Sequence, residues 1–332
     1  MSMAARRITL SFPPPGYYNG WPNTFIMPVS RSRQEVLRAS LSSFSRLRDK
    51  DESGDARAIH RTRVASRRLR ELVPVLQLPA DECRKLMRWL REATRELGAL
   101  REPDVLAGLL EALQAELPRP AGRALAPVLS DVHAVRTELH VRAGKRKLGR
   151  RLARVAKRLE KAAAHLGAEG PRRDRRWAWA VEARVARRAT AVAQAIGDAG
   201  AIYLPERLHD VRKTVKKLRY ALELQHDLAP QASRSDLARL RRGQELLGTL
   251  HDRQMVIDRI RALQASVSEP GERRSRPELD AVLVSLEDDC RRLHGRYLRG
   301  RRDLLALCEG LTAWGAPARP GRKRSLRAAS GG

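Results

Sequence analysis

Residues 59–70 read IHRTRVASRRLR, and residues 208–219 read LHDVRKTVKKLR. Both stretches begin with an aliphatic residue and a histidine and carry Arg or Lys at matching places, 149 positions apart (208 − 59). A second pair follows in the same order, since residues 97–102 read LGALRE and residues 247–252 read LGTLHD, 150 positions apart (247 − 97). Two paired elements in the same order and at nearly the same spacing indicate a duplicated helical unit of roughly 150 residues.

The two basic stretches each predict an amphipathic helix with a cationic front and an apolar back. Because a helical residue turns by about 100°, residues at relative positions 0, 3, 7 and 10 fall within an arc of about 80°. The first stripe consists of His60, Arg63, Arg67 and Arg70, and the second of His209, Arg212, Lys216 and Arg219. The side turned away carries Thr62, Leu69 and Val73 in the first helix and Val211, Leu218 and Leu222 in the second. If the duplication is also a twofold axis in space, the two stripes face each other across a cleft.

The rest of the chain predicts an all-α fold, because Ala, Leu, Arg and Glu dominate and apolar residues recur at spacings of three and four. The expected helices are 32–49, 55–77, 80–98, 102–116, 121–143, 146–166, 174–197, 205–228, 233–250, 252–265 and 276–312. Gly98 and Gly248 are expected at a close helix crossing or a turn. Repeat 1 spans about 31–165 and repeat 2 about 174–312. A poorly ordered leader (1–30) and a flexible basic tail (313–332) flank them.

The charge predicts a polyanionic partner. Lys and Arg number 67 against 38 Asp and Glu, a formal net charge of +29, far beyond what solubility requires. Nucleic acid, an anionic membrane surface and polyphosphate all offer dense negative charge. Aromatic residues make up only 4% of the chain, which weighs against a protein that stacks single-stranded bases. Three scattered cysteines favour a reducing, cytoplasmic setting, and no run approaches the ~20 apolar residues of a membrane span.

The stripes suit phosphate. Arg binds phosphate oxygens in a bidentate manner, Lys binds them as a point charge, and protonated His adds a hydrogen bond. Further basic residues are interpreted as outer surface, and these are Arg57, Arg150, Arg154, Arg296 and Arg299, together with Arg184 and Arg188. The acidic residues after the Leu-Gly pairs are expected to cap a helix or to anchor an arginine, and these are Glu102, Asp104 and Asp252.

The same residues carry a family resemblance. The His60-x-x-Arg63-x-x-x-Arg67-Arg68-Leu69-Arg70 and His209-x-x-Arg212-x-x-x-Lys216-Lys217-Leu218-Arg219-Tyr220 patterns, with the two Leu-Gly motifs, resemble the paired signatures of the CHAD family, the conserved histidine α-helical domain. The resemblance covers about residues 31–312, although Glu102 stands where the family usually has Asp. It implies two pseudosymmetric helical bundles with a basic central cavity that binds inorganic polyphosphate, and association with polyphosphate granules. By position it assigns binding to both stripes, with Lys213 and Tyr220 added.

Three other functions are alternatives to polyphosphate binding. Catalysis on polyphosphate would need carboxylates that hold Mg²⁺ or a nucleophile with its base, and carboxylates are sparse around the stripes, so we expect no catalytic residue and no cofactor. A metal site is not expected either, because the residues three and four positions after His60 and His209 include Arg63, Arg212 and Lys213, which disfavour a metal ion. The remaining alternative is sequence-nonspecific binding of nucleic acid through its phosphate backbone.

Overall fold

The computed structural model describes residues 31–48, 56–142, 145–167, 172–228, 234–266 and 276–313. Within these ranges the chain is helical and contains no strand, which confirms the predicted all-α fold class. The helices in chain order are α1 (Arg33–Arg48), α2 (Ala56–Leu72), the short 3₁₀ turn η2 (Val73–Val75), α3 (Ala80–Glu116), α4 (Arg119–Ala124), α5 (Ala126–Arg142), α6 (Lys145–Gly167), α7 (Arg172–Ala199), α8 (Pro205–Leu228), α9 (Arg234–Ser266) and α10 (Arg276–Ala313). The predicted leader, 1–30, and all of the predicted tail except Ala313 lie outside the described residues.

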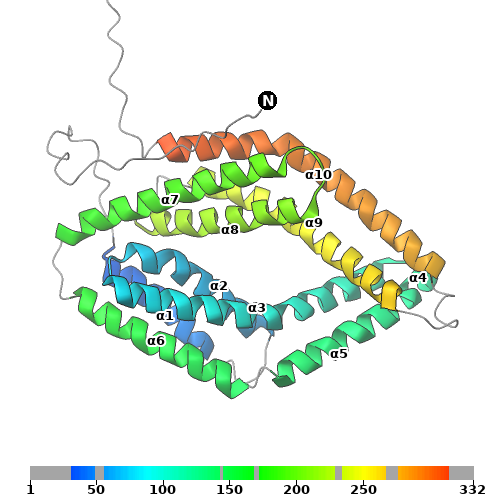
Figure 1. The fold of residues 1–332 in the computed structure, drawn as a ribbon, viewed down its shortest axis with the longest axis horizontal. Helices are drawn as coiled ribbons and strands as arrows, with labels where there is room; N and C mark the ends of the chain where they lie inside the picture. Colours follow the sequence, from blue (N-terminus) through cyan, green and yellow to red (C-terminus); the bar gives the residue numbers. More distant parts are fainter. Residues whose placement is uncertain are drawn as a thin grey trace, which may run out of the picture.

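The helices form two bundles of four. Helices α1, α2, α3 and α6 pack against one another, and α7, α8, α9 and α10 do the same (Figure 1). Each bundle closes around the apolar back of one stripe helix, because Leu69 lies in the core of the first bundle and Val211 and Leu218 lie in the core of the second. Every residue predicted to face away from the stripes is buried, as expected from the period of the helix.

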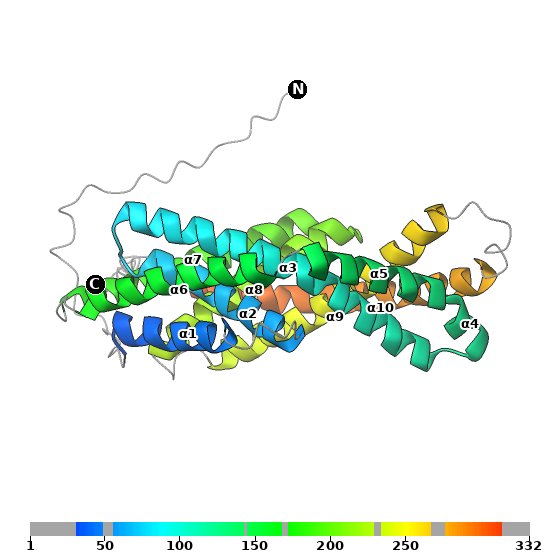
Figure 2. The ribbon, with the colours of Figure 1, turned by 90° about the horizontal axis from the view of Figure 1, so that it is seen from below.

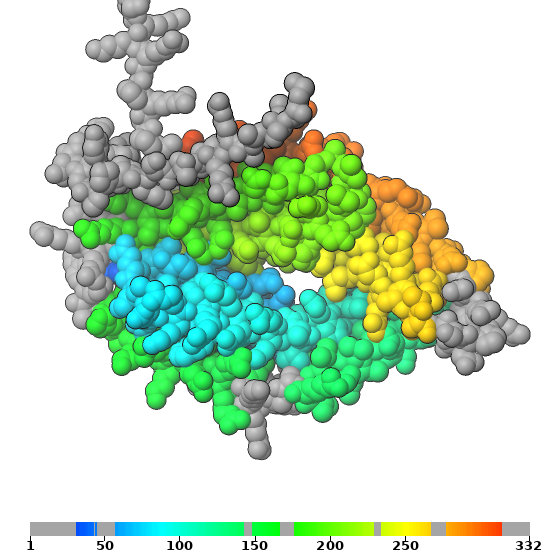
Figure 3. Space-filling model, in the orientation of Figure 1, coloured from blue at the N-terminus to red at the C-terminus, as the bar shows by residue number. Residues whose placement is uncertain are grey.

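The two bundles meet at two separate places. Helix α2 contacts α8, and farther along the molecule α3, α4 and α5 contact α9 and α10 around a third apolar core that includes Leu110 and Ile257 (Figure 2). Between these two contacts Figure 3 shows an opening through the molecule, bordered by α2, α3, α8 and α9. The mutual contact of the bundles thus leaves a central cavity, which the stripe helices border.

The long helices correct three sequence predictions. Helix α3 continues through Gly98 and Pro103, and α9 continues through Gly248, so the predicted helix ends near 98–102 and 250–252 are wrong. Burial of Leu97 and Leu100 on α3 offsets the ~1 kcal/mol that a glycine costs inside a helix. The single helix predicted over 121–143 is instead the α4–α5 pair, which is interrupted near Leu125.

A buried ion pair ties the bundles together beside the α2–α8 contact. Glu71 on α2 is 5% exposed and accepts hydrogen bonds from Arg184 Nε (2.8 Å) and Arg188 Nη2 (2.7 Å) on α7. The interpretation of these two arginines as outer surface is therefore wrong, because a buried carboxylate holds them. Among the described helices, none has the length and apolarity to cross a membrane.

Candidate functional site

The two cationic stripes lie against each other where α2 meets α8. Burial lowers the pKa of Lys216 on α8 most, and the charges of Arg212 and then of Arg67 and Arg63 on α2 lower it further. Burial also lowers the pKa of Arg212, and the charge of Arg67 adds to that shift. Such coupling between like charges requires that the side chains be close and only partly screened by water. The two helices therefore present part of each stripe to one shared space.

Two further residues join the stripes from the neighbouring helices. Arg101 on α3 is the charge that most lowers the pKa of His60 after burial itself. His251 on α9 contacts His209, with 3.2 Å between the two Nδ1 atoms. We call the central cluster the following eight residues: His60, Arg63, Arg67, Arg101, His209, Arg212, Lys216 and His251. Arg101 and His251 were not among the predicted site residues, although they occupy equivalent places in the two Leu-Gly motifs and that pairing could have identified them.

The folded protein opposes charge on the central cluster, first because its groups are buried and then because they repel one another. Burial, followed by the charges of Arg212, Arg67 and Arg63, lowers the pKa of Lys216 to about 7. Burial and then Arg67 lower the pKa of Arg63 to about 10, and burial and then Arg212 lower that of His251 to about 3. Each shift means that the free protein resists charging these groups. A ligand with several negative charges would relieve this penalty.

Among the described residues, three carboxylates partly offset the charge of the cluster, and they are Asp252, Glu102 and Asp210, the last of which acts on His209. Asp252 on α9 lies 3.9 Å from Arg212 Nη2, and burial raises the pKa of its own carboxyl. Glu102 on α3 is exposed, and its negative charge partly opposes the lowering of the pKa of Arg63. The expectation that acidic residues of the Leu-Gly motifs anchor an arginine is therefore confirmed for Asp252, and also for Asp104, which accepts a 2.8 Å hydrogen bond from Arg136 Nε. The capping alternative is wrong, because all three lie inside continuous helices.

Several buried nitrogen donors of the central cluster have no hydrogen-bond acceptor in the described part of the chain. They are the Nε atoms of Arg63, Arg101 and Arg212. A buried donor left without a partner costs about 1–3 kcal/mol, more when it is charged. The Arg63 side chain packs along α3 beside Gly98, where an added Cβ would be in ordinary van der Waals contact with Arg63 Nε at 3.7 Å. The arrangement is suited to an anion with many oxygens.

The last residue of each stripe is set apart from the cluster. Arg219 donates to Gln244 Oε1 (2.7 Å) and to Glu223 Oε1 (2.5 Å), and its guanidinium lies 4.6 Å from the centre of the Tyr220 ring. Burial lowers the pKa of Arg70, the charge of Glu71 raises it, and the charges of Arg67, Arg91 and Arg188 lower it further. Lys213 is exposed and pairs with Asp210 at 2.6 Å.

The predicted outer basic residues lie on the surface. Their side chains are exposed, and none belongs to the central cluster; these are Arg57, Arg150, Arg154, Arg296 and Arg299.

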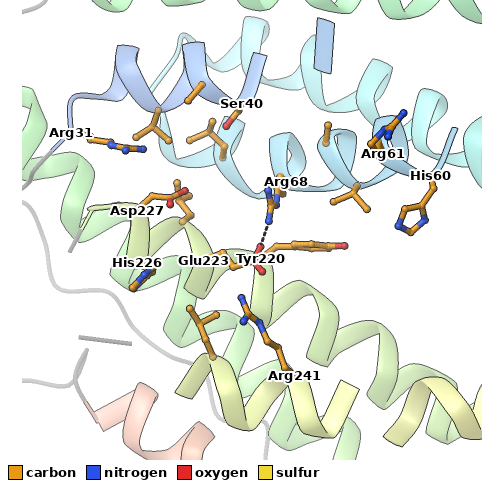
Figure 4. Close-up of a pocket in the computed structure, with 17 residues that line it drawn as sticks. Arg31, Ser40, His60, Arg61, Arg68, Tyr220, Glu223, His226, Asp227 and Arg241 are labelled. Carbon is orange, nitrogen blue, oxygen red and sulfur yellow. Dashed lines mark hydrogen bonds and ion pairs between the residues drawn. The ribbon is translucent and has the colours of Figure 1, made fainter. Parts of the chain in front are cut away.

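A pocket of about 810 Å³ adjoins the cluster on one side of the α2–α8 pair (Figure 4). It extends from His60 and Tyr220 toward α1, and Arg68 crosses it to form a 3.0 Å ion pair with Glu223. A second carboxylate, Asp227, lines the same pocket, and burial raises the pKa of that group. The lining also contains Arg31, Arg61 and Arg241, so the pocket extends the cationic surface beyond the central cluster, although Glu223 pairs with Arg68 within it.

Comparison with known proteins places the chain among helical relatives. A family model described as CHAD domain matches residues 35–261. The crystal structure of the CHAD domain from the plant Ricinus communis aligns with a TM-score of 0.54 at 20% identity, covering 86% of this chain and 94% of that one. PptA from Streptomyces chartreusis aligns with a TM-score of 0.53 at 18% identity, covering 87% and 99%. No curated protein matches the sequence.

Proposed function

The chain belongs to the CHAD domain family, and on this premise we propose that it binds inorganic polyphosphate through the central cluster. The family relates the chain to polyphosphate, and the cluster supplies the chemistry for it. The observation that carries the proposal is the set of buried guanidinium Nε donors without a partner, on Arg63, Arg101 and Arg212. Phosphate oxygens satisfy such donors with charge-assisted hydrogen bonds.

The shape of the ligand supports polyphosphate over nucleic acid. A polyphosphate chain carries its charge without bases or sugars, so it fits a cavity enclosed between two bundles. Each nucleotide of a single strand brings a base, which such proteins hold by stacking on aromatic side chains. The aromatic residue next to the cluster, Tyr220, is only 6% exposed and its ring is covered by Arg219. The part of the α2 stripe that belongs to the cluster, from His60 to Arg67, extends ~10 Å, enough for more than one successive phosphate.

Competition between the two polyanions tests this choice. We expect polyphosphate of defined length to displace fluorescently labelled single-stranded DNA from the protein at a phosphate concentration at least about tenfold lower than DNA needs to displace polyphosphate. Fluorescence anisotropy at one fixed salt concentration measures both directions, because either ligand binds more weakly as salt rises. If DNA competes better per phosphate, nucleic-acid binding replaces the proposal.

We also propose that binding occurs without hydrolysis. The carboxylates that act on the cluster, Glu102, Asp210 and Asp252, lie on three different helices. Glu102 and Asp252 each act on an arginine and Asp210 pairs with Lys213, which leaves them poorly suited to hold Mg²⁺. Incubating the protein with polyphosphate and Mg²⁺ is expected to release no orthophosphate above a protein-free control. Release that grows in proportion to protein concentration, and persists after further purification, would show catalysis.

Association with polyphosphate granules follows from the same binding. A fluorescent fusion of the full chain is expected to concentrate on granules in cells that accumulate polyphosphate. The pattern should disperse when the cells cannot make polyphosphate. Granule labelling that is independent of polyphosphate would contradict this extension and leave the binding proposal standing.

A further inference from the structure

The two halves of the central cluster differ at one pair of equivalent positions. In the first half, Arg101 on α3 lies beside His60. In the second half, the equivalent position on α9 is His251, which lies beside His209. An arginine remains charged at any physiological pH, whereas a histidine gains its charge only as the pH falls. One half therefore has a permanent cation where the other has a titratable group.

The two histidines of the second half are in direct contact. Their Nδ1 atoms are 3.2 Å apart, and their ring centres are 4.5 Å apart with an angle of 44° between the planes. In such a contact one Nδ1 must donate a proton and the other must accept it through its lone pair. The accepting ring is therefore neutral, so the pair carries at most one positive charge while the contact lasts. Neither Nε2 atom has a hydrogen-bond partner among the described residues.

The surroundings of the pair are predominantly cationic. On α8, Arg212, Lys213 and Lys216 oppose protonation of the pair, while Asp210 favours it. On α9 the neighbouring carboxylate is Asp252, which faces Arg212 and Lys216. From α2, the side chains of His60, Arg63 and Arg67 face Lys216 and Arg212 across the cavity. In the free protein these cations and burial keep the pair neutral near neutral pH.

We propose that His209 and His251 form a proton-coupled phosphate-binding site, in which polyphosphate draws a proton onto the pair and is held more tightly as the pH falls. The inference rests on the proposed function and adds to it a residue, His251, and a form of regulation. Negative charge in the cavity offsets the repulsion from Arg212 and Lys216. The protonated pair then donates a charge-assisted hydrogen bond to a phosphate oxygen.

The direction of the pH dependence of affinity, and the pH range in which it appears, follow from the pKa values of the ligand-free protein. The pKa of His251 is about 3 without ligand, so the group is neutral above about pH 4. A bound polyanion raises that pKa, and between the free and bound values each binding event takes up a proton, so affinity falls as the pH rises. Lys216, with a pKa of about 7, already holds its proton below about pH 6. Measurements from about pH 5 to about pH 6 therefore exclude titration of Lys216, and comparison with variants of His251 separates the pair from the other titratable groups of the cavity, Asp252 and His60.

His251→Arg is the decisive variant, because it gives the second half the residue of the first. The affinity of the full-length wild type for labelled polyphosphate is expected to fall with a slope of up to about tenfold per pH unit in this window. His251→Arg should flatten that slope and bind near pH 6 at least as tightly as the wild type does near pH 5. His251→Gln should flatten the slope at low affinity. Titration of the terminal phosphates is common to all variants and cancels in the comparison.

A matched control and a second measurement make the outcome decisive. His133 is half-buried on α5, with its Nε2 3.4 Å from Glu111 Oε1 and outside the cluster, so His133→Gln should keep the wild-type slope. Calorimetry in two buffers of different ionisation enthalpy should show proton uptake on binding for the wild type and clearly less for His251→Arg. A flat wild-type profile, or a slope that survives in both His251 variants, overturns the inference and leaves polyphosphate binding intact. Absence of polyphosphate binding by the wild type overturns both.

Discussion

Changing Arg63, Arg67 and Arg212 together to glutamate is expected to weaken polyphosphate binding by at least about 1000-fold. Each guanidinium lies in the shared space between α2 and α8, and a charged hydrogen bond in such a place contributes about 1.5–3 kcal/mol. Losing three of them removes more than about 4 kcal/mol, which is a factor of 10³ in the dissociation constant. Fluorescence anisotropy with labelled polyphosphate at fixed salt measures the change.

The matched control changes the same amount of charge elsewhere. Arg154, Lys157 and Lys161 are exposed on the outer face of α6, and changing these three to glutamate lowers the net charge by the same amount. We expect a change of less than about tenfold, because the long-range field weakens with screening. Equal losses in both variants would mean that the overall charge of +29, and not the cluster, binds the ligand. The neutral triple variant with glutamine, checked by circular dichroism, separates loss of binding from loss of folding.

Replacing Lys216 with methionine is expected to stabilise the free protein by about 2 kcal/mol, after allowing for solvent screening. The pKa of this buried lysine falls to about 7, which shows that the folded protein opposes its charge. Methionine has a similar length, needs no counter-charge and fills the same space. The melting temperature of the ligand-free protein should rise by a few degrees, and polyphosphate binding should weaken at the same time.

The stability gain from Lys216→Met depends on pH, and its direction follows from the lowered pKa of Lys216. Below the folded pKa of about 7 the lysine is charged in both the folded and unfolded states, and the full penalty applies. Between about 7 and the unfolded value the folded state releases its proton while the unfolded state keeps it, so the penalty shrinks as the pH rises. The stability gain from Lys216→Met should therefore be largest near pH 6 and decrease toward pH 9. Lys157→Met, at an exposed position on α6, should show no such trend.

Together the two expectations describe a site whose cations bind the ligand and also lower the stability of the ligand-free protein. An unstable cluster of cations such as Arg63, Arg212 and Lys216 is tolerated only where the rest of the fold compensates for it. The two bundle cores and the Glu71 ion pair with Arg184 and Arg188 supply that compensation. If Lys216→Met lowers the melting temperature instead, the cluster is less strained than its pKa shifts indicate.

The sequence alone predicted a large part of the fold and the core of the site. A helical period of apolar residues specifies which side of a helix is buried, so the apolar backs of α2 and α8 and the cationic stripes opposite them were correctly predicted. The ends of the helices were harder to predict from the sequence. Gly98, Pro103 and Gly248 favour a break locally, but α3 and α9 continue because packing against their neighbours outweighs a cost of about 1–3 kcal/mol.

The sequence by itself determined the local structure: the helices, the faces of those helices, and a duplication that placed like charges at matching positions. The tertiary structure decided which of those charges act together. It brought Arg101 and His251 beside the stripes, turned Arg219 away toward Glu223 and Gln244, and buried Arg184 against Glu71. The reason is physical, because the direction of a side chain from its helix follows from position in the chain, whereas its burial and its partners depend on where two bundles meet.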